Sequence, residues 1–143
     1  MMVAASENEK KRILCVDDDE VILQILENLF KDTPYLMKYE TNGKDGYDEI
    51  HSWKPHLVIL DIDMPEIDGF QVLDMVAEKI QLEQLHVVVL SGLKKDQQIL
   101  KGYKKGAVYY ITKPFPPERI TNIVSYLIGD CSKEERSRLE TLL

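Results

Sequence analysis

The chain has 143 residues and a formal net charge of −7, with 18 Lys and Arg against 25 Asp and Glu. This length is enough for one domain with a sizeable core, and the acidic balance argues against direct binding to nucleic acid or to an anionic membrane surface. The polar, acidic start and the lack of a long apolar run argue against a signal peptide and a membrane span, so we expect a cytoplasmic protein.

Short apolar runs alternate with segments of helical spacing along the chain. After a polar leader at residues 1–10, the runs typical of strands lie at 12–16, 35–40, 56–60, 85–90 and 107–111. The helical segments include residues 21–30, 47–50, 70–80, 99–103 and 120–128. In the fourth helix, Ile99, Leu100 and Tyr103 form the expected buried side.

This alternation predicts a parallel sheet with helices on both faces, which is an α/β, doubly wound (βα)5 flavodoxin-like three-layer sandwich. The strands that begin near Ile13, Leu57 and Val87 are the most continuously apolar, so we expect them in the centre. The 35–40 strand alternates in polarity and is expected at an edge. These features fit the strand order 2-1-3-4-5.

Polar residues follow four of the predicted strands: Asp17 and Asp18, Asp61, Ser91, and Lys113. The carboxyl ends of parallel strands share one edge of the sheet, so these side chains are expected to converge. Carboxylates about 4 Å apart repel by about 4 kcal/mol per pair at an effective dielectric near 20, and Mg²⁺ is the cation best suited to offset this. A carboxylate, a metal, an ammonium and a hydroxyl are the groups that phosphoryl transfer to Asp requires.

Four segments together resemble the receiver (CheY-like) domain of two-component response regulators. They are ILCVDDD at 13–19, LDIDMP at 60–65 with DG at 68–69, LSG at 90–92 and KPF at 113–115. The resemblance covers about residues 11–129, leaving the leader at 1–10 and a C-terminal helical tail or linker start at 130–143.

The resemblance implies that Asp61 is the phosphoacceptor, which takes a phosphoryl group from a sensor histidine kinase or a histidine phosphotransfer protein. Mg²⁺ would be bound directly by Asp18 and Asp61, through water by Asp17, and through the backbone carbonyl of Asp63. Lys113 would pair with the acceptor and then with the phosphoryl group. Such a domain catalyses only its own phosphorylation and dephosphorylation, and is otherwise not an enzyme.

The resemblance also implies a switch. Ser91 would move toward the phosphoryl group and Tyr110 would swing inward, which changes the face formed by the fourth helix, fifth strand and fifth helix. The implied partners at this face are a second copy of the chain after phosphorylation, or a downstream output domain or protein. Receivers also tend to have a cis peptide bond at the position of Lys113-Pro114.

The residues alone also allow interpretations other than a receiver that is phosphorylated on Asp61. The acids at 17–20 are also what a helix cap requires, Ser91 is also a turn residue, and Tyr110 is also a strand aromatic. A haloacid-dehalogenase-like phosphatase would share the Asp-x-Asp pattern of Asp61 and Asp63, but it needs a further acidic strand end after Lys113, and none follows. A pseudo-receiver, folded but never phosphorylated, is the third alternative, and the complete set of site residues weighs against it.

The last 14 residues carry a separate helix signal. Gly129-Asp130 breaks the preceding helix, Ser132 and Glu135 have the spacing of a capping box, and three leucines fall on one helical face. These leucines are Leu139, Leu142 and Leu143.

Overall fold

The computed structural model describes residues 10–143, so all but the last residue of the expected leader lies outside the described part of the chain. The strands are β1 Arg12–Val16, β2 Leu36–Glu40, β3 Leu57–Leu60, β4 His86–Ser91 and β5 Tyr109–Thr112. The helices are α1 Glu20–Phe30, α2 Gly43–Trp53, α3 Gly69–Met75, α4 Ala77–Leu82, α5 Asp96–Lys104, α6 Pro117–Ile128 and α7 Lys133–Glu140.

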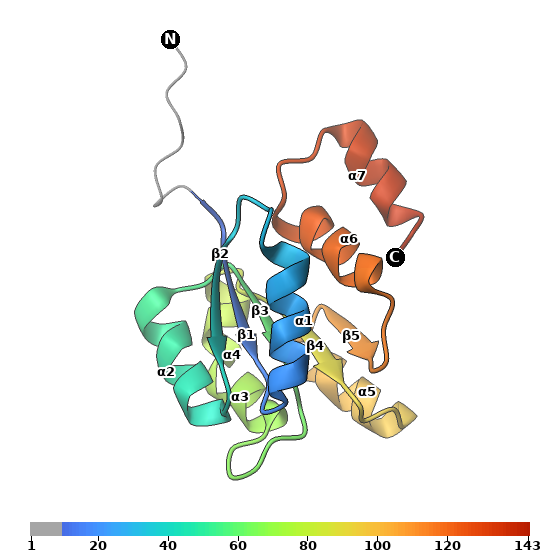
Figure 1. Ribbon diagram of the computed structural model, residues 1–143. Helices are drawn as coiled ribbons and strands as arrows, with labels where there is room; N and C mark the ends of the chain where they lie inside the picture. The colour runs from blue at the N-terminus through green and yellow to red at the C-terminus, as the bar shows by residue number, and fades with distance from the viewer. Residues whose placement is uncertain (1–9) are drawn as a thin grey trace.

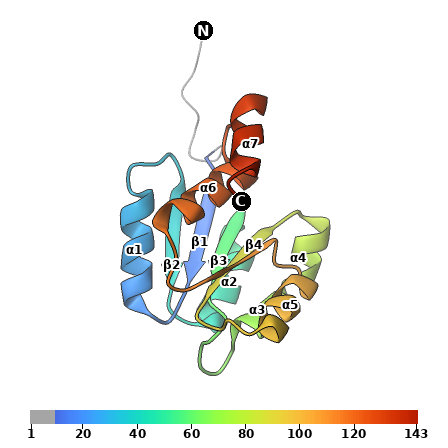
Figure 2. The ribbon, with the colours of Figure 1, turned by 90° about the vertical axis from the view of Figure 1, so that its right-hand side faces the viewer.

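The five strands form one parallel sheet in the order β2-β1-β3-β4-β5, which confirms the predicted order and the predicted edge position of the second strand. Helices α1 and α6 cover one face, and α2 to α5 cover the other (Figures 1 and 2). All five strands therefore end at the same edge, which we call the carboxyl edge; the opposite edge, where the strands begin, is the amino edge.

Both faces of the sheet are buried. Along β1, Leu14 and Val16 belong to the core under α2 to α5, whereas Ile13 and Cys15 belong to the core under α1 and α6. Successive side chains of a strand point to opposite faces, so a strand covered on both sides must be apolar at every position. This explains the continuous apolar runs of the central strands.

The third predicted helix is two helices. The backbone leaves helical geometry at Val76, with φ −109° and ψ 13°, and this residue ends α3 and precedes α4. The helix after β4 is consequently α5, and the face expected from the fourth helix, fifth strand and fifth helix is formed here by α5, β5 and α6.

The prediction that Ile99, Leu100 and Tyr103 form the buried side of α5 is wrong for two of these residues. Leu100 is 54% exposed and Tyr103 is 44% exposed. The helix approaches the sheet through Gly102 instead. A Cβ atom at this position would lie 2.8 Å from the Tyr110 ring, so the larger neighbours are turned outward. The Tyr103 hydroxyl still accepts a hydrogen bond from the Tyr110 N–H at 3.1 Å.

The C-terminal helix α7 packs on α6. Ser132 caps it by accepting a hydrogen bond from the Glu135 N–H at 3.1 Å, as the capping pattern predicted. Tyr126 of α6 donates to Glu140 at 2.7 Å, and Leu143 packs against the core under α6, whereas Leu142 is 59% exposed. Within residues 10–143, every helix is too short or too polar to cross a membrane.

Candidate functional site

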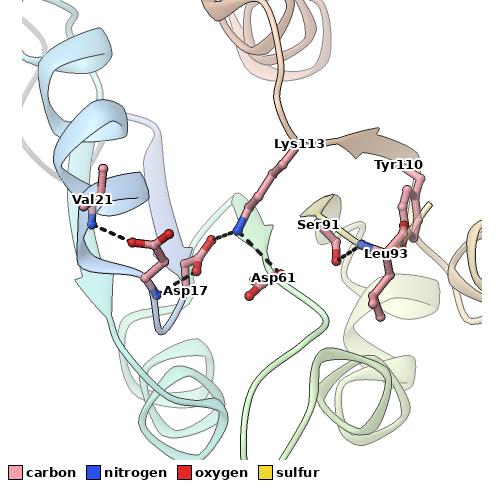
Figure 3. A network of polar contacts seen from close by, with 8 residues as sticks. Asp17, Val21, Asp61, Ser91, Leu93, Tyr110 and Lys113 are labelled. Carbon is pink, nitrogen blue, oxygen red and sulfur yellow. Dashed lines mark hydrogen bonds and ion pairs between the residues drawn. The ribbon is translucent and has the colours of Figure 1, made fainter.

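The loop after β1 brings Asp17 to the carboxyl edge (Figure 3). Asp17 is only 3% exposed, and its Oδ1 accepts a hydrogen bond from the Asp19 N–H at 2.9 Å. Asp19 is the residue that caps α1, through its Oδ1 and the Val21 N–H at 2.9 Å. The capping interpretation therefore accounts for Asp19 and leaves the carboxylates of Asp17 and Asp18 for another purpose.

Asp61 joins these two acids from the end of β3. Its backbone N–H donates to the Val16 carbonyl at 2.9 Å, which holds the first residue after β3 beside the end of β1. Carboxylate oxygens of Asp17, Asp18 and Asp61 lie within 4.8 Å of one another. The convergence of these three acids, expected from the strand order, is thus observed.

Lys113 is the cation of the cluster. Its Nζ lies 2.8 Å from Oδ2 of Asp17 and 3.7 Å from Oδ1 of Asp61, so its closer partner is Asp17 and not the expected acceptor. The Lys113 N–H donates to the Ser91 carbonyl at 2.9 Å, which fixes the lysine beside β4. The following peptide bond to Pro114 is cis, as the resemblance implied.

The charge balance at Asp61 is incomplete. Burial and the neighbouring Asp17 raise the pKa of Asp61 to about 7, against the opposing effect of Lys113. Among the described side chains, Oδ1 of Asp61 is a buried oxygen without a hydrogen-bond partner. A buried carboxylate oxygen in this condition costs free energy unless another positive group reaches it.

The donor set fits a hard divalent cation. Asp17, Asp18 and Asp61 offer three carboxylates of mixed exposure, and a buried oxygen of Asp61 has capacity for a further partner. Oxygen donors of this kind are those that Mg²⁺ prefers, with water and phosphate oxygens completing its shell. The side chain of Asp63 is exposed, and its backbone forms a hydrogen bond that lowers the pKa of the Asp61 carboxyl.

Ser91 and Tyr110 lie on the other side of Asp61 from Asp17 (Figure 3). Ser91 is fully buried, and its Oγ accepts a hydrogen bond from the Leu93 N–H at 3.2 Å. The Tyr110 hydroxyl donates to the Leu93 carbonyl at 2.7 Å, and its ring is 6% exposed. The backbone of Leu93 therefore links the two residues that the resemblance assigned to the switch.

A residue that sequence reasoning treated only as a turn supports the site. At Gly69, a Cβ atom would lie 2.3 Å from the carbonyl oxygen of Asp61 and 2.7 Å from Cα of Ile62. The Gly69 N–H donates to the Ile62 carbonyl at 2.8 Å and closes the loop after the acceptor. The Asp-Gly pair at 68–69 was the available signal, but it does not reveal this close approach.

The sequence model of the response regulator receiver domain matches residues 13–125. The Arabidopsis thaliana two-component response regulator ARR10 is 33% identical over 119 residues, which are 82% of this chain and 21% of that protein. The Thermotoga maritima chemotaxis protein CheY is 29% identical over 117 residues, which are 80% of this chain and 95% of that protein. The chain thus belongs to the response regulator receiver domain family.

Solved structures agree with this family. The BeF₃-activated DrrB receiver domain superposes with a TM-score of 0.73 at 30% identity, covering 82% of this chain and 97% of that chain. A CheY-like receiver domain protein from Methanospirillum hungatei has the same fold, with a TM-score of 0.75 at 22% identity over 94% of this chain and 100% of that chain. The chain spans about a fifth of the length of the plant relatives, which are considerably longer proteins. Receiver domains are signalling domains, and this defines the class of the protein.

Proposed function

We propose that the protein is a phosphorylation-dependent switch of a two-component phosphorelay, with Asp61 as phosphoacceptor. The observation that carries the proposal is the cluster of Asp17, Asp18 and Asp61 around the Lys113 ammonium in a chain of the receiver family. The phosphoryl donor is a phosphohistidine of a sensor histidine kinase or a histidine phosphotransfer protein.

In the transfer, a carboxylate oxygen of Asp61 attacks phosphorus and forms a P–O bond while the P–N bond to the donor imidazole breaks. The imidazole nitrogen keeps the electron pair of that bond, and proton uptake restores the neutral ring. Bound Mg²⁺, held by Asp18 and Asp61 with Asp17 acting through water and Asp63 through its carbonyl, would neutralise charge on the phosphoryl oxygens. Hydrolysis later returns the carboxylate and releases phosphate.

Lys113 has a second role in this scheme. In the described state its ammonium is 2.8 Å from Asp17 and 3.7 Å from Asp61. Phosphorylation adds negative charge at Asp61, so the balance of attraction shifts the ammonium from Asp17 toward the phosphoryl group. The lysine stabilises the product without leaving the edge of the sheet, since its backbone is held to β4.

The signal leaves the site through Ser91, Leu93 and Tyr110. The Ser91 hydroxyl turns to donate to a phosphoryl oxygen, and the Leu93 backbone loses its acceptor. Tyr110 is bonded to the same residue, so the loop after β4 and the face of α5, β5 and α6 respond together. A second copy, an output domain or a separate protein reads this face, and α7, which packs on α6, contributes to what that partner meets.

Intact-mass measurement tests the proposal. The protein is incubated with a small-molecule phosphodonor and Mg²⁺, with chelator in a parallel sample, and with Asp61→Asn as the matched variant. One added phosphoryl group that requires both Mg²⁺ and Asp61 is the expected result. An adduct that persists in Asp61→Asn refutes the assignment of the acceptor, whereas no adduct from either the small donor or a phosphorylated phosphotransfer protein supports the pseudo-receiver alternative.

A further inference from the structure

A cavity of about 570 Å³ lies at the amino edge of the sheet, at the opposite end of the strands from Asp61. Its wall is formed by residues that precede β1, β3 and β4 and by the ends of α2, α4 and α6, together with one residue of α7. Small-molecule sites in proteins typically have volumes of about 300–1,000 Å³. The strands separate it from the candidate phosphorylation site by roughly 15 Å, given a rise of about 3.3 Å per residue.

The charged residues on this wall are mostly basic. The cations are Lys11, Lys54, Lys79 and Arg136, and the acids are Glu83 and Asp130. The imidazoles of His56 and His86 and the amide of Gln84 are the other polar side chains of the lining. The cavity is therefore locally basic, although the whole chain has a net charge of −7.

Helix ends explain part of this basicity. The carboxyl ends of helices carry partial negative charge, which cations offset. Arg12 donates to the Trp53 carbonyl at 3.1 Å and to the Lys54 carbonyl at 2.7 Å at the end of α2. Arg136 donates to the Tyr126 carbonyl of α6, and Lys79 pairs with Glu83 at 3.2 Å. The two arginines thus offset the ends of α2 and α6, and Lys79 is paired with the Glu83 side chain, so none of these contacts uses the ammonium of Lys11 or Lys54.

Within the described residues, the ammonium groups of Lys11 and Lys54 are therefore not needed to offset the charge of the helix ends. The two imidazoles add directed donors. His56 accepts a hydrogen bond from the Arg12 N–H at its Nδ1, at 2.9 Å, so the proton of the neutral ring resides on Nε2. His86 begins the adjacent strand, where its backbone N–H is bonded to the His56 carbonyl at 3.2 Å, and the two rings belong to one wall.

The apolar part of the wall comes from Ile50, Pro55, Leu85, Leu127 and Ile128. An apolar floor with a few convergent polar groups is the usual composition of a small-molecule site. The ammonium groups of Lys11 and Lys54 repel cations, so they disfavour a metal ion at the imidazoles. The same two positive charges favour a doubly charged anion. We propose that this cavity binds a small organic phosphate, with its charged head against the lysines and imidazoles and its apolar body on the floor.

The electrostatics give the site a pH dependence. Burial and Lys11 lower the pKa of both His56 and His86, and Arg12 also lowers that of His56. The other charged groups of the wall are Lys54, the Lys79–Glu83 pair, Arg136 and Asp130, of which only Asp130 is an unpaired acid among the described residues. A bound anion offsets the positive charge of the lysines, so its binding should raise the pKa of both His56 and His86.

The test uses the full chain without Mg²⁺ and phenylphosphonate as the probe, whose P–C bond prevents transfer to Asp61. NMR signals of the two imidazoles are followed during the titration, and calorimetry gives the affinity. We expect saturable binding and a rise of both histidine pKa values on saturation. Inorganic phosphate is expected to move the same signals with weaker affinity, because it lacks an apolar body.

Variants locate the site. Lys11→Gln and Lys54→Gln are each expected to weaken binding roughly three- to tenfold. Lys94→Gln, a lysine outside the wall, is the matched control, and neither it nor Asp61→Asn changes the affinity. All variants are checked by their thermal midpoints. The proposal is overturned by the absence of saturable imidazole shifts, by equal weakening in Lys94→Gln, or by a loss of binding in Asp61→Asn. Since the last variant abolishes the proposed phosphorylation, failure of one proposal does not imply failure of the other.

Discussion

The two edges of the same sheet are built on opposite electrostatic plans. At the carboxyl edge, Asp17 and Asp61 are buried with one ammonium between them, and the pKa of Asp61 is raised to about 7. At the amino edge, Arg12 and Arg136 offset the carbonyls that end α2 and α6. The carboxyl edge holds like-charged carboxylates together and is strained unless a cation binds, whereas at the amino edge arginines offset the helix ends and two further lysines remain available.

The largest expected effect comes from removing the Lys113 ammonium, the cation paired with Asp17 and Asp61. Lys113→Met leaves Asp17 and Asp61 as unpaired buried acids, so the free energy of unfolding near pH 8 should fall by about 3 kcal/mol. Chemical denaturation measures this value, with Lys113→Arg as the charge-conserving control. Unchanged stability in Lys113→Met would mean that the carboxylates are well solvated.

Mg²⁺ should relieve the same strain. Binding to the folded state alone raises the free energy of unfolding by about 2.7 kcal/mol at a concentration of 100 times Kd. Mg²⁺ competes with the proton on Asp61, so its affinity should rise with pH up to about 7.

The exposed Asp18 supplies the matched variant for this experiment. Asp18→Asn should weaken the Mg²⁺-induced shift in the thermal midpoint, with roughly tenfold lower affinity. Its stability without metal should change little. Equal shifts in the wild type and in Asp18→Asn would remove Asp18 from the metal site.

The carboxyl edge should contribute its own pH dependence of stability through Asp61. The folded-state pKa of Asp61 lies above its ordinary value of 3.8, so the folded state holds this proton more tightly and its contribution to stability is lost as the pH rises from about 4 to about 7. With allowance for solvent screening, the loss is about 2 kcal/mol. Asp61→Asn should flatten the curve over this window, and an unaltered curve would contradict the raised pKa.

The smallest expected effect is at the amino edge. Arg12→Gln removes the guanidinium from the Trp53 and Lys54 carbonyls and should lower the free energy of unfolding by about 1 kcal/mol. The loss should be smaller near pH 5 than near pH 8, because Arg12 also lowers the pKa of His56, and its removal relieves that repulsion as the imidazole takes up a proton. An equal loss at both pH values would contradict the effect of Arg12 on the pKa of His56.

Sequence was sufficient for the features that depend on local pattern. The continuous apolar runs of β1, β3 and β4 required burial on both faces, and the resulting order brought Asp17, Asp18 and Asp61 together as expected. The break at Val76 was not visible, because the apolar spacing of α3 and α4 continues across it.

Features that depend on distances between elements were not predictable. Gly102 lets α5 approach Tyr110, which turned the expected buried Leu100 outward. The closer pairing of Lys113 with Asp17 depends on fractions of an ångström at the sheet edge. The cavity at the amino edge combines residues from seven elements and their flanks, none of which has a motif.

The most direct test of the central claim is the position of the phosphoryl group. After incubation with phosphodonor and Mg²⁺, borohydride reduction converts an aspartyl phosphate into homoserine, and peptide mass spectrometry locates the converted residue. We predict conversion at Asp61 alone, in the wild type and in Lys11→Gln, and none when Mg²⁺ is chelated. Conversion at Asp17, Asp18 or Asp63, or conversion that does not require Mg²⁺, would contradict the account of the carboxyl edge.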